Sequence, residues 1–408
     1  MSIQDIVIIG AGAAGCFSAV IASEMNPSLK IRILEKTRQP LAKVKISGGG
    51  RCNVTHHCFT PALLIENYPR GREFLQNAFS RFQPKDMIDW LSSHGVVLKT
   101  EKDGRMFPTT DRSQTIIDCF LKILEKQGVV LSLESEVTSL SLVEGLFYIQ
   151  LRNEEMICSK KVLLATGGVQ KSYFLAERMG HNIEPGVPSL FTFELQEEWI
   201  KACSGSVAPA ASIFFQGFSK ETQGPVLITH WGLSGPAVLK LSAFAARWLS
   251  DRNYQAKVVV NWVDLAEKEV QEALFQARKK SSAKKIFQSP LFALSKNFWK
   301  ALLTQLVPHL EEIAWFRATK EDIQKIARFL THTEFTLIGK SLNKEEFVTC
   351  GGVDLKDVDP KTFQSKKIPG LYFAGELLNI DGVTGGFNFQ SAWTSSYLAA
   401  HSMLREFS

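Results

Sequence analysis

Short apolar runs that end in glycine-rich turns recur along the chain. Residues 6–9 (IVII) form a continuous apolar run rich in β-branched side chains, which is typical of a buried parallel strand. The motif GAGAAG follows at once at residues 10–15, and the apolar pattern after it predicts a helix over residues 13–24. Residues 31–34 (IRIL) supply the next strand. The N-terminal segment is therefore predicted to be a βαβ unit.

The spacing of glycines and one acid in this unit predicts a dinucleotide site. Gly10 permits the turn after the strand, Gly12 lets a pyrophosphate approach bare backbone, and Gly15 allows close packing of the helix. The positive end of the helix dipole attracts the phosphates. Glu35 ends the second strand 20 positions after Gly15, where a ribose-binding carboxylate belongs.

Two later segments repeat the pattern of a strand that ends in small residues. Residues 162–168 (VLLATGG) and 370–376 (GLYFAGE) both have it, and a helix is predicted over residues 391–404. The glycine pair 385–386 precedes that helix and predicts a second helix N-terminus at the cofactor. FAD is long enough to be held by segments far apart in sequence, so three such turns favour FAD over a nicotinamide as the bound cofactor.

The middle of the chain has a different pattern. Short strands are expected at residues 190–195, 211–216, 225–229 and 257–262, and glycine turns separate some of them. Helical periodicity follows over residues 264–330, and strands resume at residues 331–337 and 346–349. In THWGLSGPA (residues 229–237), Ser234 is the expected cap of a helix that has Pro236 in its first turn.

These patterns together predict an α/β fold, in which a Rossmann domain carries an inserted β-rich domain and a small helical domain. The expected segments are residues 1–188 and 350–408 for the FAD-binding domain, 189–263 and 331–349 for the β-rich domain, and 264–330 for the helical subdomain.

Charge and composition add a possible partner. The chain has 408 residues and a formal net charge of +6, and residues 265–340 contain 13 Lys/Arg against 8 Asp/Glu, which gives +5 of that total. A solvated helical surface explains this excess, and so does contact with a polyanion.

The seven cysteines form no CxxC pair and no metal-ligand spacing, so reduced thiols, no metal site and a cytoplasmic location are expected. The N-terminus has no basic stretch typical of a signal peptide, and no apolar run reaches the ~20 residues of a membrane span.

Seven motifs carry a resemblance to a known family. They are GAGAAG (10–15), SGGGRCNVT (47–55), GRMFP (104–108), ATGG (165–168), THWGLSGPA (229–237), CGGV (350–353) and GLYFAGELLNIDGVTGGFNFQSAW (370–393). With these motifs the chain resembles the bacterial BaiN/RdsA family of NAD(P)/FAD-dependent oxidoreductases, which includes aminoacetone-oxidase-like members. The resemblance covers residues 1–56, 84–119, 160–190 and 222–400. It implies a glutathione-reductase-type FAD domain and FAD as cofactor.

In proteins similar to this one, the SGGGRCN loop lies along the FAD. Three consecutive glycines at residues 48–50 would then leave space for the ligand. Lys43 and Arg51 would balance phosphate charge, although a structural bridge from Arg51 to a carboxylate is an alternative. The motifs and the resemblance together give these expected FAD-binding residues: Gly10, Gly12, Ala13, Ala14, Gly15, Glu35, Lys36, Lys43, Ser47, Gly48, Gly49, Gly50, Arg51, Cys52, Asn53, Val137, Ala165, Thr166, Gly167, Gly168, Gly375, Glu376, Asp381, Gly385, Gly386, Phe387, Asn388 and Gln390.

The resemblance implies reduction of conjugated C=C bonds with NAD(P)H as electron donor, including uridine to dihydrouridine in 23S rRNA, and amine oxidation in other members. Cys52 is a candidate proton donor, with a buried, inert thiol as the alternative. His230 is a candidate acid or substrate contact, with a hydrogen-bonded structural histidine as the alternative.

Three hypotheses for the function remain open. The first is a uridine reductase that contacts rRNA through residues 265–340. The second is an oxidase of a small amine such as aminoacetone, which needs no polyanion surface. The third is a non-catalytic RNA-binding or assembly factor stabilised by the flavin.

Overall fold

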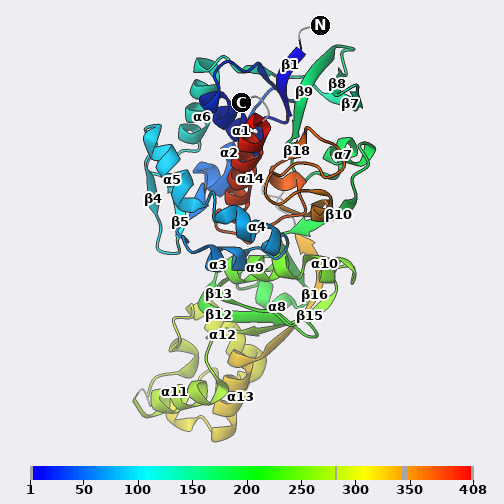
Figure 1. Ribbon diagram of the computed structural model, residues 1–408. Helices are drawn as coiled ribbons and strands as arrows, with labels where there is room; N and C mark the ends of the chain where they lie inside the picture. Colours follow the sequence, from blue (N-terminus) through cyan, green and yellow to red (C-terminus); the bar gives the residue numbers. More distant parts are fainter. Residues whose placement is uncertain (1–2, 281–282, 342–347, 406–408) are drawn as a thin grey trace. The chain divides into compact units, whose positions relative to one another are not determined.

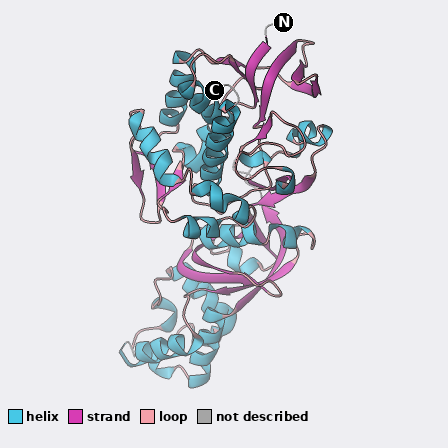
Figure 2. Cartoon of the chain, in the orientation of Figure 1, coloured by secondary structure: helices cyan, strands magenta, loops and turns pink. Residues whose placement is uncertain are grey.

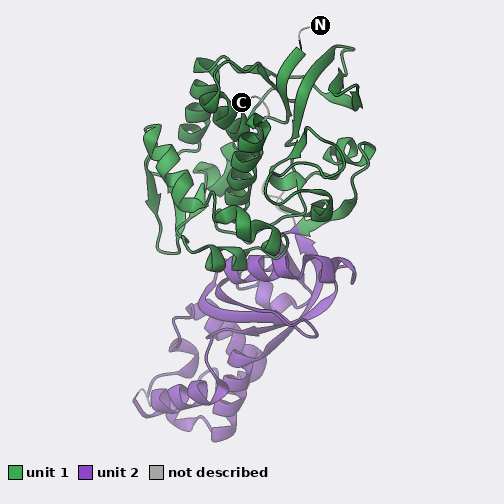
Figure 3. Ribbon diagram, in the orientation of Figure 1, with its two compact units in different colours: residues 1–188, 344–408 green, residues 189–343 purple. Residues whose placement is uncertain are grey.

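The computed structural model describes residues 3–280, 283–341 and 348–405, which fold into two compact units (Figure 3). Unit 1 comprises residues 1–188 and 344–408, and unit 2 comprises residues 189–343. Both units combine helices and strands (Figure 2). Residue 346, where the last strand was predicted to begin, lies outside the described residues.

Unit 1 is built on a seven-stranded sheet in the order β6-β2-β1-β9-β8-β7, with β18 also paired to β9 (Figure 1). Its strands are β1 (Ile3–Ile9), β2 (Ile31–Leu34), β6 (Val130–Ser132), β7 (Val137–Val143), β8 (Leu146–Leu151), β9 (Met156–Leu164) and β18 (Leu371–Phe373). The pairs β6/β2, β2/β1, β1/β9 and β9/β18 are parallel, whereas β8 pairs antiparallel with β9 and β7. The predicted βαβ unit is therefore confirmed, with its two strands adjacent and parallel.

Helices and two small sheets complete unit 1. The small sheets consist of β3 (Thr55–His56), β5 (Arg105–Pro108) and β4 (Leu98–Thr100), and of β10 (Ile183–Ser189) with β17 (Val348–Val353). The α-helices are α1 (Ala13–Met25), α2 (Ala42–Gly50), α3 (Pro61–Leu64), α4 (Arg72–Phe79), α5 (Pro84–Ser93), α6 (Gln114–Lys126), α7 (Phe174–Arg178) and α14 (Phe387–Leu404). The 3-10 helices are η1 (Ile65–Asn67), η2 (Gln170–Ser172), η6 (Leu355–Asp357) and η7 (Gly375–Leu377). Helix α14 begins four residues before its predicted start and packs against α1.

Unit 2 is a closed β-barrel with helices. The barrel order is β11 (Thr192–Leu195), β14 (Gly232–Ser234), β13 (Glu221–Ile228), β12 (Val207–Phe215), β15 (Ala256–Asn261) and β16 (Thr333–Ser341). The α-helices are α8 (Glu198–Lys201), α9 (Pro236–Phe244), α10 (Ala246–Ser250), α11 (Glu267–Lys280), α12 (Lys296–Leu306) and α13 (Lys320–Thr331). The 3-10 helices are η3 (Ile286–Gln288), η4 (Pro308–Leu310) and η5 (Trp315–Arg317).

One hydrophobic core runs through unit 2. It includes barrel residues such as Phe193 and Val258 and helical residues such as Trp299 and Ile326. Helices α11 to α13 thus share their core with the barrel. A separate helical subdomain over residues 264–330 stays a prediction.

The predicted capping role of Ser234 is wrong. Helix α9 is preceded by Gly235, and Pro236 is its first residue. The φ of Gly235 is 95°, which residues other than glycine rarely adopt. Ser234 instead ends the short strand β14, where its Oγ accepts a hydrogen bond from Thr192 Oγ1 at 2.9 Å. Gly235 rather than Ser234 therefore stands directly before the helix, because the chain turns sharply at this position.

We expect the stability of unit 1 to fall as the pH drops below about 6.5, because His181 is held neutral. Its Nε2 lies 2.7 Å from Ser365 Oγ and its Nδ1 lies 3.1 Å from the Ala176 carbonyl. Burial lowers the pKa of His181 below its usual value of 6.5, so the unfolded state binds the extra proton first and acid favours unfolding. When the pH is lowered from 7.5 to 5.5, the midpoint temperature of thermal unfolding should therefore fall less for His181→Asn than for the wild type. The exposed His57 gives the control, since His57→Asn should follow the wild-type profile.

Candidate functional site

The predicted glycine turns lie at one edge of the main sheet of unit 1. The parallel strands β2, β1, β9 and β18 are neighbours and all end there. Backbone hydrogen bonds tie each strand end to the next, from Gly10 N to Leu34 O at 2.8 Å, Ala165 N to Ile9 O at 2.9 Å, and Ala374 N to Leu164 O at 3.1 Å. Segments that are more than 150 residues apart in sequence thus meet at the carboxyl edge of the sheet, where open α/β sheets bind ligands.

The first turn has the geometry that its three glycines predict. Gly10 has φ of 107°, and a Cβ there would overlap the Ala165 carbonyl. A Cβ on Gly15 would overlap the Gly10 carbonyl, so this glycine is required for the helix to pack against the turn. Gly12 differs, because a Cβ there would meet no heavy atom within 4 Å. Bare backbone at the N-terminus of α1 therefore faces open space, as a phosphate site requires.

Glu35 is held at the end of β2 by the same turn. Its Oε2 accepts a hydrogen bond from Ala11 N at 2.9 Å, and its Oε1 accepts from Thr37 N at 2.9 Å and Thr37 Oγ1 at 2.8 Å. Each carboxylate oxygen can accept two hydrogen bonds, so Oε2 retains capacity for a hydroxyl group. Lys36, also predicted at the cofactor, is exposed beside it, and the predicted Val137 is buried at the start of β7.

Helix α2 ends in three consecutive glycines with left-handed backbone conformations. The φ values of Gly48, Gly49 and Gly50 are 57°, 67° and 81°. Gly48 packs against Phe107 of the GRMFP motif, whereas a Cβ on Gly49 or Gly50 would meet nothing within 4 Å. Leu41 N, just before α2, donates to Ala11 O at 2.8 Å, which ties this segment to the phosphate turn. The three glycines therefore allow the left-handed turn, and the backbone of Gly49 and Gly50 is open on the side where a side chain would stand.

The contacts of Arg51 favour the alternative of a structural bridge to a carboxylate. Its guanidinium donates to Glu101 at 2.6 Å and lies 4.0 Å from the centre of the Phe107 ring. Asp111 is a second carboxylate, 3.7 Å from Arg51. The positive charge of Arg51 is thus already balanced within unit 1.

Cys52 is fully buried, and burial raises the pKa of its thiol to about 12. The thiol is therefore protonated at neutral pH and is not a nucleophile. In this conformation it has no exposed surface through which to reach a substrate, which favours the inert alternative.

Glu376 joins four of the segments. Its Oε2 pairs with Lys43 of α2, and its Oε1 accepts from Thr349 N, next to the CGGV motif, at 3.0 Å. Its side chain also covers Gly168, where a Cβ would come within 2.8 Å of it. Lys43, Gly168 and Glu376, all predicted cofactor residues, are therefore brought together, and the ion pair between Lys43 and Glu376 links α2 to η7.

Side chains at the start of α14 hold the turn that precedes this helix. Asn388 Oδ1 accepts from Gly382 N at 2.8 Å, and its Nδ2 donates to Gly382 O at 2.8 Å. Gln390 hydrogen-bonds Thr55 at 2.6 Å, and Phe387 stacks on His56 with ring centres 4.7 Å apart. Asn388, Gln390 and Phe387 therefore fix the shape of the turn.

Two other predicted residues in this region also have structural partners. Asp381 is completely buried and paired with Arg70. Asn53, in the amide orientation that satisfies both of its polar atoms, accepts from Gly386 N at 2.9 Å and donates to Thr55 O at 3.0 Å. Both side chains hold segments of unit 1 together, so direct contact with a cofactor is a weaker explanation for them.

The open backbone positions fit FAD. Gly12, the adjacent pair Gly49 and Gly50, and Gly167 come from three separate segments, and at each of them a Cβ would meet no heavy atom within 4 Å. Among the described residues the buried Asn379 Oδ1 has no hydrogen-bond partner, as expected of an atom that faces a ligand. Asn379 was not among the residues predicted from the sequence, because an orphaned oxygen leaves no sequence signal.

His230 belongs to unit 2. It is exposed, and its ring contacts Trp231 with centres 4.8 Å apart. Within the described residues it makes no hydrogen bond, so the alternative of a hydrogen-bonded structural histidine is not supported.

The family described as "HI0933-like protein Rossmann domain" matches residues 4–402. The chain belongs to this family. The protein is 31% identical to the ribosomal RNA dihydrouridine synthase of Haemophilus influenzae, with 98% of each chain covered. It is 29% identical to the enzyme of the same name from Escherichia coli, again with 98% of each chain covered. It is also 27% identical to a 3-dehydro-bile acid delta(4,6)-reductase of Clostridium scindens, over 96% of this chain and 97% of that one.

Solved structures support the fold. A 3-ketosteroid delta1-dehydrogenase from Sterolibacterium denitrificans matches over the whole of both chains with a TM-score of 0.53 at 11% identity. A 3-ketosteroid-delta4-(5alpha)-dehydrogenase from Rhodococcus jostii matches over 98% of this chain and 97% of that one with a TM-score of 0.52 at 14% identity. The predicted α/β flavoenzyme fold is confirmed, and this HI0933-like protein is an FAD-dependent oxidoreductase. The hypothesis of a non-catalytic factor is therefore not supported. No helix within the described ranges is long and apolar enough to cross a membrane.

Proposed function

We propose that this protein is an NAD(P)H-dependent reductase that converts uridine in large-subunit ribosomal RNA to dihydrouridine. The observation that carries the proposal is the 31% identity, over 98% of both chains, to a protein named as a ribosomal RNA dihydrouridine synthase. Two enzymes with that name and a bile acid reductase match almost the full length of the chain.

The reaction saturates one C=C bond of the uracil ring, which requires a hydride on one carbon and a proton on its neighbour. Bound FAD supplies the hydride chemistry. The chain contributes binding and orientation. The backbone around Gly12 and the N-terminus of α1 would hold the pyrophosphate, and Glu35 would accept hydrogen bonds from ribose hydroxyls. Gly49 and Gly50, at which a Cβ would meet nothing within 4 Å, would present bare backbone to the cofactor.

We propose that the proton donor is a group other than Cys52, because the thiol of Cys52 is fully buried. In this proposal the proton comes from another group or from water that reaches the substrate. Replacement of Cys52 by alanine should therefore leave both FAD content and turnover close to wild type. A loss of turnover with FAD retained would return Cys52 to the mechanism.

A basic surface on the helices of unit 2 suits RNA. The exposed Phe316 has the Arg317 guanidinium 5.4 Å from its ring centre, and Arg278 Nη2 donates to its carbonyl at 3.5 Å. Lys279 and Lys280 follow Arg278 at the end of α11. An exposed aromatic ring among cations can stack on an unpaired base while the cations contact phosphates.

We expect the triple substitution of Arg278, Lys279 and Lys280 by glutamine to weaken binding of single-stranded rRNA fragments. The slope of log K against log salt concentration should decrease in magnitude by about two, since each lost phosphate contact on a single strand removes ~0.7. Fluorescence anisotropy from 50 to 300 mM salt measures this slope. The control replaces Lys285 and Lys300, whose charges are paired with Glu312 and Glu311. An unchanged slope in the triple variant would rule out this surface as the RNA contact.

The proposed activity is tested by incubating the FAD-loaded protein and NADPH or NADH with an unmodified rRNA fragment, followed by nucleoside mass spectrometry. Dihydrouridine should form only with protein and nicotinamide present. The competing amine-oxidase hypothesis predicts instead that aminoacetone and O2 are consumed and that the RNA is unchanged.

A further inference from the structure

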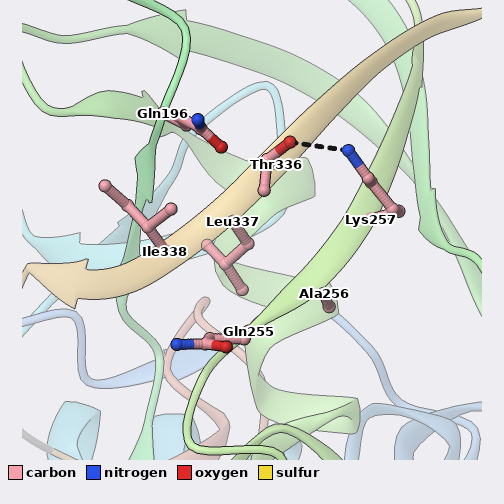
Figure 4. A pocket seen from close by; sticks show the side chains of 7 residues that line it. All are labelled: Gln196, Gln255, Ala256, Lys257, Thr336, Leu337 and Ile338. Atoms are coloured by element: carbon pink, nitrogen blue, oxygen red, sulfur yellow. Dashed lines mark hydrogen bonds between the residues drawn. The ribbon is translucent and has the colours of Figure 1, made fainter.

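A shallow hollow of about 400 Å³ lies on the surface of the barrel of unit 2 (Figure 4). It is lined by Gln196, Gln255, Ala256, Lys257, Thr336, Leu337 and Ile338. These residues come from β15, β16 and the residues flanking β11 and β15. Nothing in the sequence patterns or in the relatives' names points to this hollow.

The hollow combines one exposed apolar side chain with two amides. Ile338 lies between Gln196 and Gln255 in Figure 4, whereas the side chain of the neighbouring Leu337 is buried in the core of unit 2. Both glutamines are exposed, and neither side-chain amide hydrogen-bonds another residue in the part of the chain that the structure describes. Ile338 has half of its surface exposed. Each amide offers a donor and an acceptor beside an apolar surface.

One lysine, Lys257, lines this surface, and a second, Lys340, follows Ile338 by two residues on β16. Lys257 Nζ donates to Thr336 Oγ1 at 2.7 Å, and Lys340 Nζ lies 3.2 Å from the centre of the Tyr254 ring. Neither forms an ion pair with a carboxylate among the described residues. The carboxylate of Glu197 is also close, since it accepts from Thr336 N at 2.9 Å. A neutral group between the two amides, with an anion next to Lys257, fits this distribution of charge.

We propose that the hollow binds one unstacked nucleobase of single-stranded RNA, with neighbouring phosphates at Lys257 and Lys340. The exposed side chain of Ile338 packs against the face of the base, and Gln196 and Gln255 hydrogen-bond its edges, as in other recognition of splayed bases. This inference rests on the proposed function, because it assumes an RNA substrate. It adds a second contact, on the barrel rather than on the basic helices.

The double variant Gln196→Ala/Gln255→Ala tests the proposal. We expect about thirtyfold weaker binding of a 12-nucleotide oligouridine in fluorescence anisotropy, since ~1 kcal/mol is typical for each of the two hydrogen bonds lost. The salt dependence should not change, because amides carry no charge. The matched control is Gln276→Ala/Gln305→Ala, which removes two exposed amides from α11 and α12. Crosslinks from 4-thiouridine should map to β15 or β16 in the wild type and diminish in the test variant.

The outcomes separate this proposal from the proposed function. Equal binding and equal crosslinking in the test variant and wild type would overturn the nucleobase site, even if the wild type forms dihydrouridine. Weaker binding in the test variant, together with no dihydrouridine formed by the wild type, would support the site and overturn the proposed reaction. Thermal melting of both double variants confirms that they are folded.

Discussion

Replacing Gly12 by valine is expected to abolish FAD binding while the protein stays folded. The backbone of Gly12 has φ of −80° and ψ of −169°, an extended conformation that valine adopts readily. A Cβ at this position meets no heavy atom of the protein within 4 Å. The added side chain therefore costs the fold little, but it occupies the space through which a pyrophosphate approaches the N-terminus of α1.

Affinity for FAD is measured by titrating the apoprotein and following the quenching of flavin fluorescence. We expect Gly12→Val to weaken binding at least ~100-fold, equivalent to about 3 kcal/mol, with far-ultraviolet circular dichroism unchanged. Gly12→Ala is the matched comparison, since its single methyl group also meets no heavy atom of the protein within 4 Å and extends less far into the same space, so it should weaken binding less than valine does. Wild-type FAD affinity in the Gly12→Val variant would show that the pyrophosphate does not lie at this turn.

Replacing Arg70 by methionine is expected to lower the free energy of unfolding by about 3–5 kcal/mol. Arg70 Nε donates to Asp381 Oδ1 at 2.6 Å, its Nη2 contacts the other carboxylate oxygen, and Asp381 is completely buried. Removal of the guanidinium leaves a buried carboxylate without its counter-charge. Because the pair joins the segment before α4 to the turn before α14, the loss should also weaken FAD binding.

Urea denaturation of the apoprotein measures this effect. The variant Arg70→Met/Asp381→Leu should recover part of the loss, since no buried charge remains in it. Arg72→Met is the matched control: Arg72 pairs with Glu66 at 3.5 Å on the surface, and its loss should cost less than about 1 kcal/mol. If the Arg70 variant is as stable as this control, the buried pair does not contribute to folding.

The sequence predicted the FAD-binding framework well because its signals are local. Residues 6–9 and 31–34 are strands, and Gly10, Gly12 and Gly15 each have the geometry that their role requires. The three glycine turns also share one sheet edge, since parallel strands end on the same side. These features follow from apolar runs and backbone demands that can be read without tertiary contacts.

Features that depend on partners distant in sequence were not predictable in the same way. Glu101 binds Arg51, which was expected at a phosphate, from 50 residues away, and Arg70 pairs with Asp381, which was expected at the cofactor, across 311 residues. The closure of the barrel in unit 2 depends on the three-residue strand β14, which is too short for its pattern to be recognised. The start of helix α9 was also not predictable, since Gly235 rather than Ser234 stands before it.

The most direct test of the proposed function is anaerobic stopped-flow spectroscopy of the FAD-loaded protein. The flavin is first reduced with one equivalent of NADPH and then mixed with an unmodified large-subunit rRNA fragment, and the RNA is analysed by mass spectrometry. The proposal predicts that the flavin is reoxidised at a rate that depends on RNA concentration and that one uridine gains two hydrogens. A flavin that stays reduced in the presence of RNA, is reoxidised only by O2 and leaves the RNA mass unchanged would contradict it.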